Sequence, residues 1–515
     1  MKRQKLYHLT LFFFFVLSVG SMQPVMAELT QQQITRTLYQ ATFGPTPQSR
    51  AQLESQGLSL WLENQLNYPP TLHINLYQTP FTRGAQANRE NSWYQISVTS
   101  QDQLRQRTAF ALSQILVVSR YGNSLSGKAL GLVTYYDLLV ENAFGNYRDL
   151  LYKTATHPVM GSYLSMMGSK KADNTTGSLP DENYARELMQ LFTIGLYELN
   201  MDGTKKRDSA GNAIPTYNQS DVQELARSLT GWLTSDSAFT KPMRVVDWRH
   251  DGGSKAFLGS TIPSGLNADD ELNLVMDILM AHDNIAPFVS KQLIQRLVTS
   301  NPTPDYVERV ASVFNDNGSG TKGDLGAVVS AILTDPEALG LSTVQPIKLK
   351  EPIIVFMNFH RALGFEPIDN RYYGAVGLMN SANQGALRSR SVFNFYSPDY
   401  VPSISFSNAG LVAPEFELLD WSVYTDVVNT MYNEIRQNGG RTHALALNEY
   451  YQLLDDHPAL VTLIDQRLLG GDASTELKET LLNVLDAYKS NYVAKTKLSL
   501  AFFTVLSSQE FFVQD

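Results

Sequence analysis

The chain of 515 residues carries 50 acidic and 41 basic side chains, which gives a formal net charge of −9, and it contains no cysteine. The lack of cysteine excludes disulfides, thiolate metal sites and thiol nucleophiles. The acidic balance argues against nucleic acid or an anionic membrane as a partner, because their electrostatic capture needs clustered lysine and arginine.

Residues 1–27 have the pattern of a secretory signal peptide. Three basic side chains lie within the first five positions, residues 9–19 are almost wholly apolar, and residues 25–27 offer small side chains for cleavage. The apolar run is shorter than the roughly 20 residues of a transmembrane helix, and no later run of this kind follows. We therefore expect a protein exported to the periplasm or cell exterior, with no transmembrane segment after signal removal. An uncleaved membrane anchor is the alternative.

Most of the remaining chain repeats apolar residues with a period of 3.6, which predicts a mainly α-helical, multi-helix globular array. One or two small β-hairpins are expected as excursions from it. Residues 196–201 should pair with 214–217, and residues 244–248 with 255–259, because loops rich in Asp, Gly and Asn separate them. The clearest helical patterns cover residues 102–119, 290–298, 324–333, 350–363, 418–435, 476–488 and 498–513.

Composition shifts suggest three units after the signal peptide. Residues 28–262 form an N-terminal helical unit with the polar hairpin region, and residues 263–400 form a central helical unit. A crossing loop and a C-terminal helical unit make up residues 401–515. The length is sufficient for two or three domain-sized cores.

The segment PDENYARELMQL, residues 180–191, is the first of two polar helices. At 100° per residue, Asn183, Arg186 and Glu187 share one arc with Gln190 and Thr193, opposite an apolar arc. This split predicts a helix that buries one face and presents a polar row on the other.

The second helix follows in YNQSDVQELARSLTGW, residues 217–232. Ser220 and Gln223 fit a capping box, while Glu224 and Arg227 lie away from the apolar stripe. If a hairpin brings the two helices together, their charged residues could form either an ion network that fixes helix order or a binding or active site.

A loop that follows the two polar helices in the sequence contains two further titratable residues. His250 and Asp251 precede the flexible pair Gly252-Gly253, and loops of this kind often carry functional side chains. A hairpin turn with incidental charges is the alternative. In a hydrolase, Glu187 or Asp251 would act as acid or base with His250.

Metal and nucleotide sites are not expected from local spacing. No His-Glu-x-x-His helix occurs, and no two histidines are close enough in sequence to form a ligand pair on one helix turn. Zinc could be held only by ligands from distant segments. Glycine-rich phosphate loops and a Gly-x-Ser-x-Gly elbow are also missing, so we predict no metal and no cofactor.

The stretch SVFNFYSPDY, residues 391–400, gathers aromatic side chains beside Arg388 and Arg390. Such residues can stack on sugar rings while the guanidinium groups bind the substituents, so Arg388 is a candidate binding residue. Packing of a long crossing loop into the core is the simpler alternative.

The chain resembles the bacterial "domain of unknown function 1800" family over almost its whole length after the signal. The resemblance is carried, in order, by PDENYARELMQLFTIG, YNQSDVQELARSLTGW, HDGGSKAFLG, LKEPI with HRALG, SVFNFYSPDY and LSSQEFFVQ. It implies export and a helical fold. Because members are often encoded beside an exported sulfatase-like family, it also implies a possible sulfatase-like partner protein, and it assigns no catalytic residue.

Together these patterns favour an accessory or binding protein of the periplasm or cell surface, which docks a polysaccharide or a partner through a polar cleft. The residues expected there are Glu187, His250 and Asp251 as candidate catalytic groups, with Asn183, Arg186, Glu224, Arg227 and Arg388 as binding groups. A hydrolase acting on an extracytoplasmic polymer and a purely structural helical scaffold are the alternatives.

Overall fold

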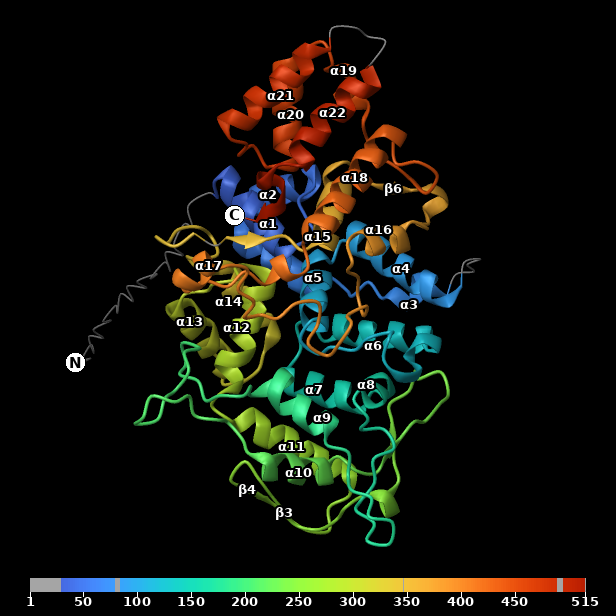
Figure 1. Ribbon diagram of the computed structural model, residues 1–515, viewed down its shortest axis with the longest axis vertical. Helices are drawn as coiled ribbons and strands as arrows, with labels where there is room; N and C mark the ends of the chain where they lie inside the picture. Colours follow the sequence, from blue (N-terminus) through green and yellow to red (C-terminus); the bar gives the residue numbers. More distant parts are fainter. Residues whose placement is uncertain (1–28, 79–83, 346, 489–493, 515) are drawn as a thin grey trace, which may run out of the picture.

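The computed structural model describes residues 29–78, 84–345, 347–488 and 494–514, and its mainly α-helical architecture confirms the predicted fold class (Figure 1). The predicted signal peptide, residues 1–27, lies outside the described residues. None of the helices in the described ranges is an apolar stretch of the length that a lipid bilayer requires.

The first eight helices follow one another up to residue 163. Capping boxes start α1 and α2, in which Thr30 pairs with Gln33 and Thr46 with Ser49. The predicted helix 102–119 ends early, because tight i to i−3 bonds at Gln114 and Ile115 close its last turn. The helices are α1 (Gln31–Ala41), α2 (Pro47–Asn67), α3 (His73–Tyr77), α4 (Ala85–Thr99), α5 (Gln103–Ser113), α6 (Ala129–Glu141), α7 (Tyr147–Thr156) and α8 (Pro158–Tyr163).

The two polar helices lie at one end of the molecule as α9 (Asn183–Glu187) and α10 (Gln219–Ser228) (Figure 1). A π-helix, Leu188–Thr193, continues α9, with the Thr193 hydroxyl donating to the Leu188 carbonyl at 2.6 Å. The wider turn changes the 3.6-residue phase after Glu187, and Thr193 is buried instead of lying on an open polar face. Glu187, at the end of α9, is buried as well.

The hairpin predictions are corrected in their pairing. Strand β2 (Arg244–Val245) pairs with β1 (Trp232–Leu233), and β3 (Lys255–Phe257) pairs with β4 (Ser260–Ile262), so 244–248 does not pair with 255–259. Positive φ angles at Leu258 and Gly259, 47° and 73°, form the tight turn between β3 and β4. The predicted hairpin of residues 196–217 exists as three isolated antiparallel bridges.

Among the central helices, α11 to α14 each pack on the next one in the sequence, whereas α15 and α16 both pack on α4. Helices α12, α13 and α14 stack on one another, and α12 also contacts α5. Among them, α14 and α15 agree with the predicted patterns to within two residues, and α12 begins five residues before its predicted start. They are α11 (Ala268–Ala281), α12 (Ile285–Leu297), α13 (Pro304–Asn315), α14 (Leu325–Thr334), α15 (Pro352–Ala362) and α16 (Ala375–Ser381).

The C-terminal helices α19 to α22 occupy the end of the molecule opposite α10 (Figure 1). Here α18 packs against α15, α16 and α22. The pattern over 498–513 divides at Ser508, whose hydroxyl caps a separate short helix. The helices are α17 (Ile404–Asn408), α18 (Trp421–Gln437), α19 (Asn448–Gln452), α20 (His457–Leu468), α21 (Thr475–Ala487), α22 (Ala494–Leu506) and α23 (Gln509–Phe512).

Two small sheets join segments that are distant in sequence. Strand β5 (Lys348–Leu349) pairs with β8 (Val513–Gln514), and β6 (Glu366–Pro367) pairs with β7 (His443–Ala444). In addition, Lys350 Nζ donates to the Phe511 carbonyl at 2.9 Å. The C-terminal residues are thereby fixed to the central segment.

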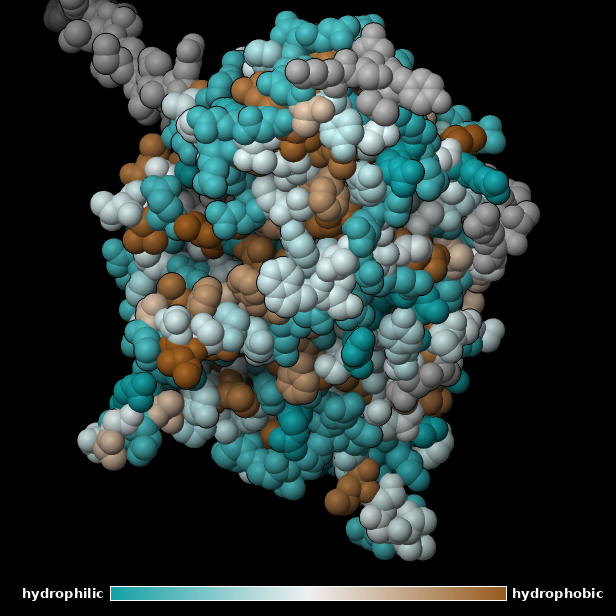
Figure 2. Space-filling view, turned by 45° about the horizontal axis from the view of Figure 1, so that its top comes forward, coloured by the Kyte–Doolittle hydropathy of each residue, from teal (hydrophilic) through white to brown (hydrophobic). Residues whose placement is uncertain are grey.

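One hydrophobic cluster includes buried residues from Phe43 to Phe512, and a smaller one joins α1 and α2 to α14. On the face shown in Figure 2, exposed hydrophobic residues form small scattered patches in a mostly hydrophilic surface. The predicted unit boundaries at 262/263 and 400/401 concern independent folding and stay a prediction.

Candidate functional site

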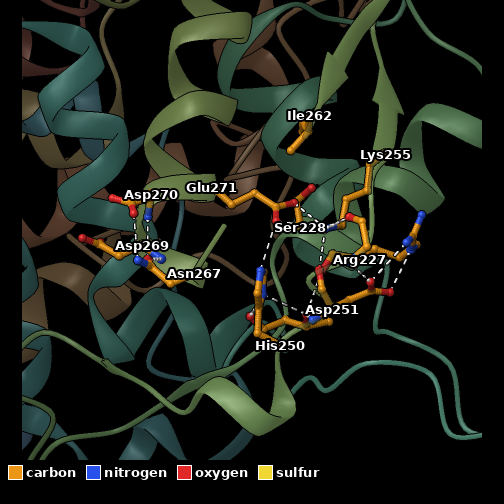
Figure 3. Close-up of polar contacts among 12 residues, drawn as sticks. Arg227, Ser228, His250, Asp251, Lys255, Ile262, Asn267, Asp269, Asp270 and Glu271 are labelled. Carbon is orange, nitrogen blue, oxygen red and sulfur yellow. Dashed lines mark hydrogen bonds and ion pairs between the residues drawn. The ribbon is translucent and has the colours of Figure 1, made fainter. Parts of the chain in front are cut away.

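The structure brings Glu224, Arg227 and Asp251 together, as Figure 3 shows in part. Arg227 donates from Nε and Nη2 to the two oxygens of Asp251 at 2.8 and 3.1 Å, and from Nη1 to Glu224 at 2.7 Å. Burial raises the pKa of Asp251, but the hydrogen bonds from Arg227 and the Gly253 amide, together with the charges of Arg227 and Lys255, outweigh it and hold the pKa below its usual value. Both Asp251 oxygens are therefore committed to the ionised, paired form.

His250 lies in a buried network next to this pair (Figure 3). Its Nε2 is 3.0 Å from Glu271 on α11, and its Nδ1 is 3.0 Å from the Thr230 carbonyl. Lys255 on β3 completes the network at 2.7 Å from Glu271. These contacts occupy both ring nitrogens of His250, and they connect the segment after α10 with β3 and α11.

Arg186 and Glu187 are placed apart from this network. Arg186 donates to Glu182 at 3.0 Å, and the exposed Asn183 begins α9. Glu187 is 7% exposed, and its Oε2 has no hydrogen-bond partner. Burial raises the pKa of Glu187, and the charge of Arg186 offsets only part of this effect. The predicted single cluster is thus two separate groups, and no described contact joins Glu187 to His250.

Arg388 lies in a pocket of about 600 Å³, which we call the Arg388 pocket. Amide and guanidinium groups dominate its walls, and Phe395 contributes an aromatic surface. A pocket of this size suits one small polar ligand or one unit of a polymer. It is lined by Tyr121, Met379, Asn380, Asn383, Arg388, Arg390, Asn394, Phe395, Glu417 and Leu418.

The Arg388 side chain is held by the pocket wall but is not saturated. Its Nη2 donates to Asn380 at 2.7 Å and to the Tyr121 hydroxyl at 3.3 Å. Its Nη1 is buried without a hydrogen bond, 3.8 Å from the carboxylate of Glu90. The Asn394 amide nitrogen is also buried and has no partner. Two buried donors at one pocket therefore make no hydrogen bond, although Arg388 Nη1 forms a long ion pair with Glu90, and buried donors without a hydrogen bond are rare.

The charge behind the pocket is positive. The buried Glu90 carboxylate accepts from Arg89 at 3.0 Å and pairs with Arg120, while Arg388 approaches it from a third side. Burial is the main cause that lowers the pKa of Arg89 to about 10; the charge of Glu90 opposes it, and the charges of Arg120 and Arg388 add to it. Three guanidinium groups share one carboxylate, so the wall favours an anion.

The backbone around the pocket is unusual. Asn383, Leu387 and Asn394 adopt positive φ angles of 49°, 57° and 70°. Asparagine tolerates this conformation, whereas it is costly for leucine. The Leu387 carbonyl accepts from the Arg120 amide at 3.0 Å, which anchors the strained segment. Strain of this kind gathers at binding and active sites, where it orients side chains in advance.

The aromatic stretch 391–400 is divided between the core and the Arg388 pocket, and a role in stacking on sugar rings stays a prediction. Tyr396 is buried with the Arg296 guanidinium 5.0 Å from its ring centre, so it packs into the core. Phe393 is 57% exposed, and Phe395 faces the Arg388 pocket. Of the predicted site residues, Arg388 is therefore the one that lines this cavity.

Sequence reasoning missed a further cluster of side chains that could bind a metal ion. His360, Glu434 and His443 offer ligand atoms that all lie within 4.8 Å of one another. They come from α15, the end of α18 and β7, so no local spacing could reveal them. The one available signal was the position of His360 in the motif HRALG, for which the family resemblance gave no role.

No curated protein and no solved structure matches the chain. The family model that matches is described as a protein of unknown function, DUF1800, and it covers residues 36–513. Because this match includes nearly the whole chain, the protein belongs to the DUF1800 family.

Proposed function

We propose that the protein is an accessory or binding protein that acts outside the cytoplasm and holds an acidic sugar unit of a polysaccharide in the Arg388 pocket. The observation that carries this proposal is the pair of buried donors without acceptors, Arg388 Nη1 and Asn394 Nδ2, at one cavity. A carboxylate or another anionic oxygen would supply the missing acceptor.

The other walls suit a sugar ring. Asn380 and Asn383 carry amides that can donate to and accept from hydroxyl groups. Phe395 offers an apolar surface for the ring face, and the positive charge behind Glu90 selects an acidic unit over a neutral one. Because the lining includes no histidine and one carboxylate, Glu417, we favour binding over hydrolysis for this cavity.

Export and the periplasmic or cell-surface location belong to the same proposal. They are supported by the signal-like residues 1–27 and by the family resemblance. A sulfatase-like partner protein would act on the same class of polymer, and co-purification of the two proteins from the native envelope would test that association.

The binding proposal is tested by titration with alginate, a polymer of acidic sugars, and with the neutral polymer dextran. We expect alginate to bind and salt to weaken the binding, because exposed charges are screened, and we expect no binding of dextran. Arg388→Gln should lower alginate affinity by at least about tenfold, because a hydrogen bond to a charged group contributes about 1.5–3 kcal/mol.

Arg207→Gln is the matched control, because Arg207 is an exposed arginine on the hairpin of residues 196–217 and does not line the Arg388 pocket. Circular dichroism establishes that both variants are folded. The proposal fails if the wild-type protein binds alginate no better than dextran, or if Arg388→Gln binds alginate as tightly as the Arg207→Gln control.

A further inference from the structure

Three side chains with metal-ligating atoms converge away from the Arg388 pocket. His360 Nε2 lies 2.6 Å from Glu434 Oε2, and His443 Nε2 lies 3.4 Å from the same oxygen. The three atoms are mutually within 4.8 Å. We propose that His360, Glu434 and His443 bind one divalent transition-metal ion, for which zinc is the best match.

The outer nitrogens of both histidines are already engaged. His360 Nδ1 is 2.7 Å from the Tyr94 hydroxyl, and His443 Nδ1 is 3.1 Å from the Thr442 hydroxyl. Metal-binding histidines show this arrangement, because an oxygen on the outer nitrogen fixes the ring orientation and the tautomer. Both Nε2 atoms are thereby turned toward Glu434.

The site also contains an unsatisfied polar atom. His443 is 2% exposed, and its Nε2 is buried without a hydrogen bond, since the contact to Glu434 is long. A buried polar atom without a partner is costly. A cation between the two rings and the carboxylate would satisfy it and would also neutralise the carboxylate.

The donor set indicates which metal fits. Two imidazole nitrogens and one carboxylate oxygen suit zinc and similar borderline ions, whereas magnesium and calcium prefer oxygen ligands alone. Phe365 and Tyr372 pack against the His443 ring at centroid distances of 4.9 and 5.5 Å and shield it. The Glu434 side chain is 15% exposed, so an ion can enter beside it.

The position of the triad suggests a structural role. His360 belongs to the predicted central unit, and Glu434 and His443 belong to the predicted C-terminal unit. The strands β6 and β7 pair beside the triad, and Pro367 is the register partner of His443. A bound ion would therefore fasten α15, α18 and β7 to one another and stabilise the junction of the two units.

The test is the binding of added zinc by the full chain, after dialysis against a chelator has removed any bound metal. We expect about one zinc ion per chain by elemental analysis after gel filtration, and saturating zinc should raise Tm by about 3 °C or more. Glu434→Gln preserves the size of the side chain and should lower zinc affinity by at least about tenfold. Tyr94→Phe, which leaves all three ligands in place, should lower it about 10- to 100-fold.

His457→Asn is the matched control, because His457 also pairs with a carboxylate, that of Asp486, but has no second histidine beside it. It should bind zinc like the wild type. His443→Asn serves as a second ligand variant if Glu434→Gln does not fold. The proposal is overturned if the wild-type protein retains no stoichiometric zinc, or if a folded ligand variant binds zinc as tightly as the control.

Discussion

Replacing Lys255 by Met tests the buried network that joins β3 to α11. The Lys255 ammonium and the Glu271 carboxylate are 0% and 1% exposed and lie 2.7 Å apart. Methionine keeps most of the apolar stem but leaves the Glu271 charge without its strongest partner. It also removes the donor to the Gly253 carbonyl, which Lys255 reaches at 3.0 Å.

The expected cost is large, because removing one partner of a buried ion pair leaves an uncompensated charge and destabilises a protein by about 3–5 kcal/mol. Adding Glu271→Gln removes that charge while keeping an acceptor for His250. The double variant should therefore be more stable than the sum of the two single changes predicts, by at least about 1 kcal/mol.

Urea unfolding, followed by circular dichroism and by tryptophan fluorescence, measures these differences when the two transitions coincide. Lys206→Met is the control, because its pair with Glu198 is 3.5 Å long with both side chains 37% exposed, and the loss should be below about 1 kcal/mol. A cost for Lys255→Met no larger than that of the control, or strict additivity in the double variant, would refute this account.

Two further changes probe the same end of the molecule. Burial raises the pKa of Glu187, so the ionised carboxylate destabilises the folded state above that pKa, and the penalty disappears as the pH falls to the value of the unfolded chain. Glu187→Gln should therefore raise the urea midpoint at pH 7 relative to wild type, with a difference that shrinks toward about pH 4; a difference independent of pH would contradict this cause. Gly231 has a φ of +96°, and an added Cβ would lie 2.9 Å from the His250 Cβ. Gly231→Ala should lower the urea midpoint more than Gly265→Ala does. Gly265 has a φ of +89° and open space around it, so its substitution adds only backbone strain of about 1–2 kcal/mol. Equal urea midpoints for the two variants would show that the contact with His250 relaxes freely.

Helices were predictable wherever the apolar period continued without interruption. The patterns over 324–333 and 350–363 became α14 and α15 with small shifts at their ends. For α10 the prediction of a capping box was correct in kind but wrong in position, because Asn218 with Asp221 competes with the Ser220 pattern and lies two residues earlier.

The pairing of strands and the helical phase of polar residues were less predictable than the positions of the helices. The tight β3–β4 turn could not be predicted at Leu258, because leucine rarely adopts the positive φ that the turn requires. The π-helix changed the phase of the polar arc after Glu187, over Leu188–Thr193. Arg388 was identified from its aromatic neighbours, but Glu90 and Arg120 come from distant helices and loops, and only the folded chain brings them to the same cavity.

The pairing of β5 with β8 has a consequence for the order of folding. The Lys350 ammonium finds its acceptor 161 residues further along the chain, and the Gln514 amide donates to the Leu297 carbonyl at 2.9 Å. The β5–β8 sheet and these two hydrogen bonds therefore depend on contacts between segments that are distant in the sequence. Contacts between segments so far apart in the sequence form slowly, so we expect this junction to be among the late-forming parts of the fold.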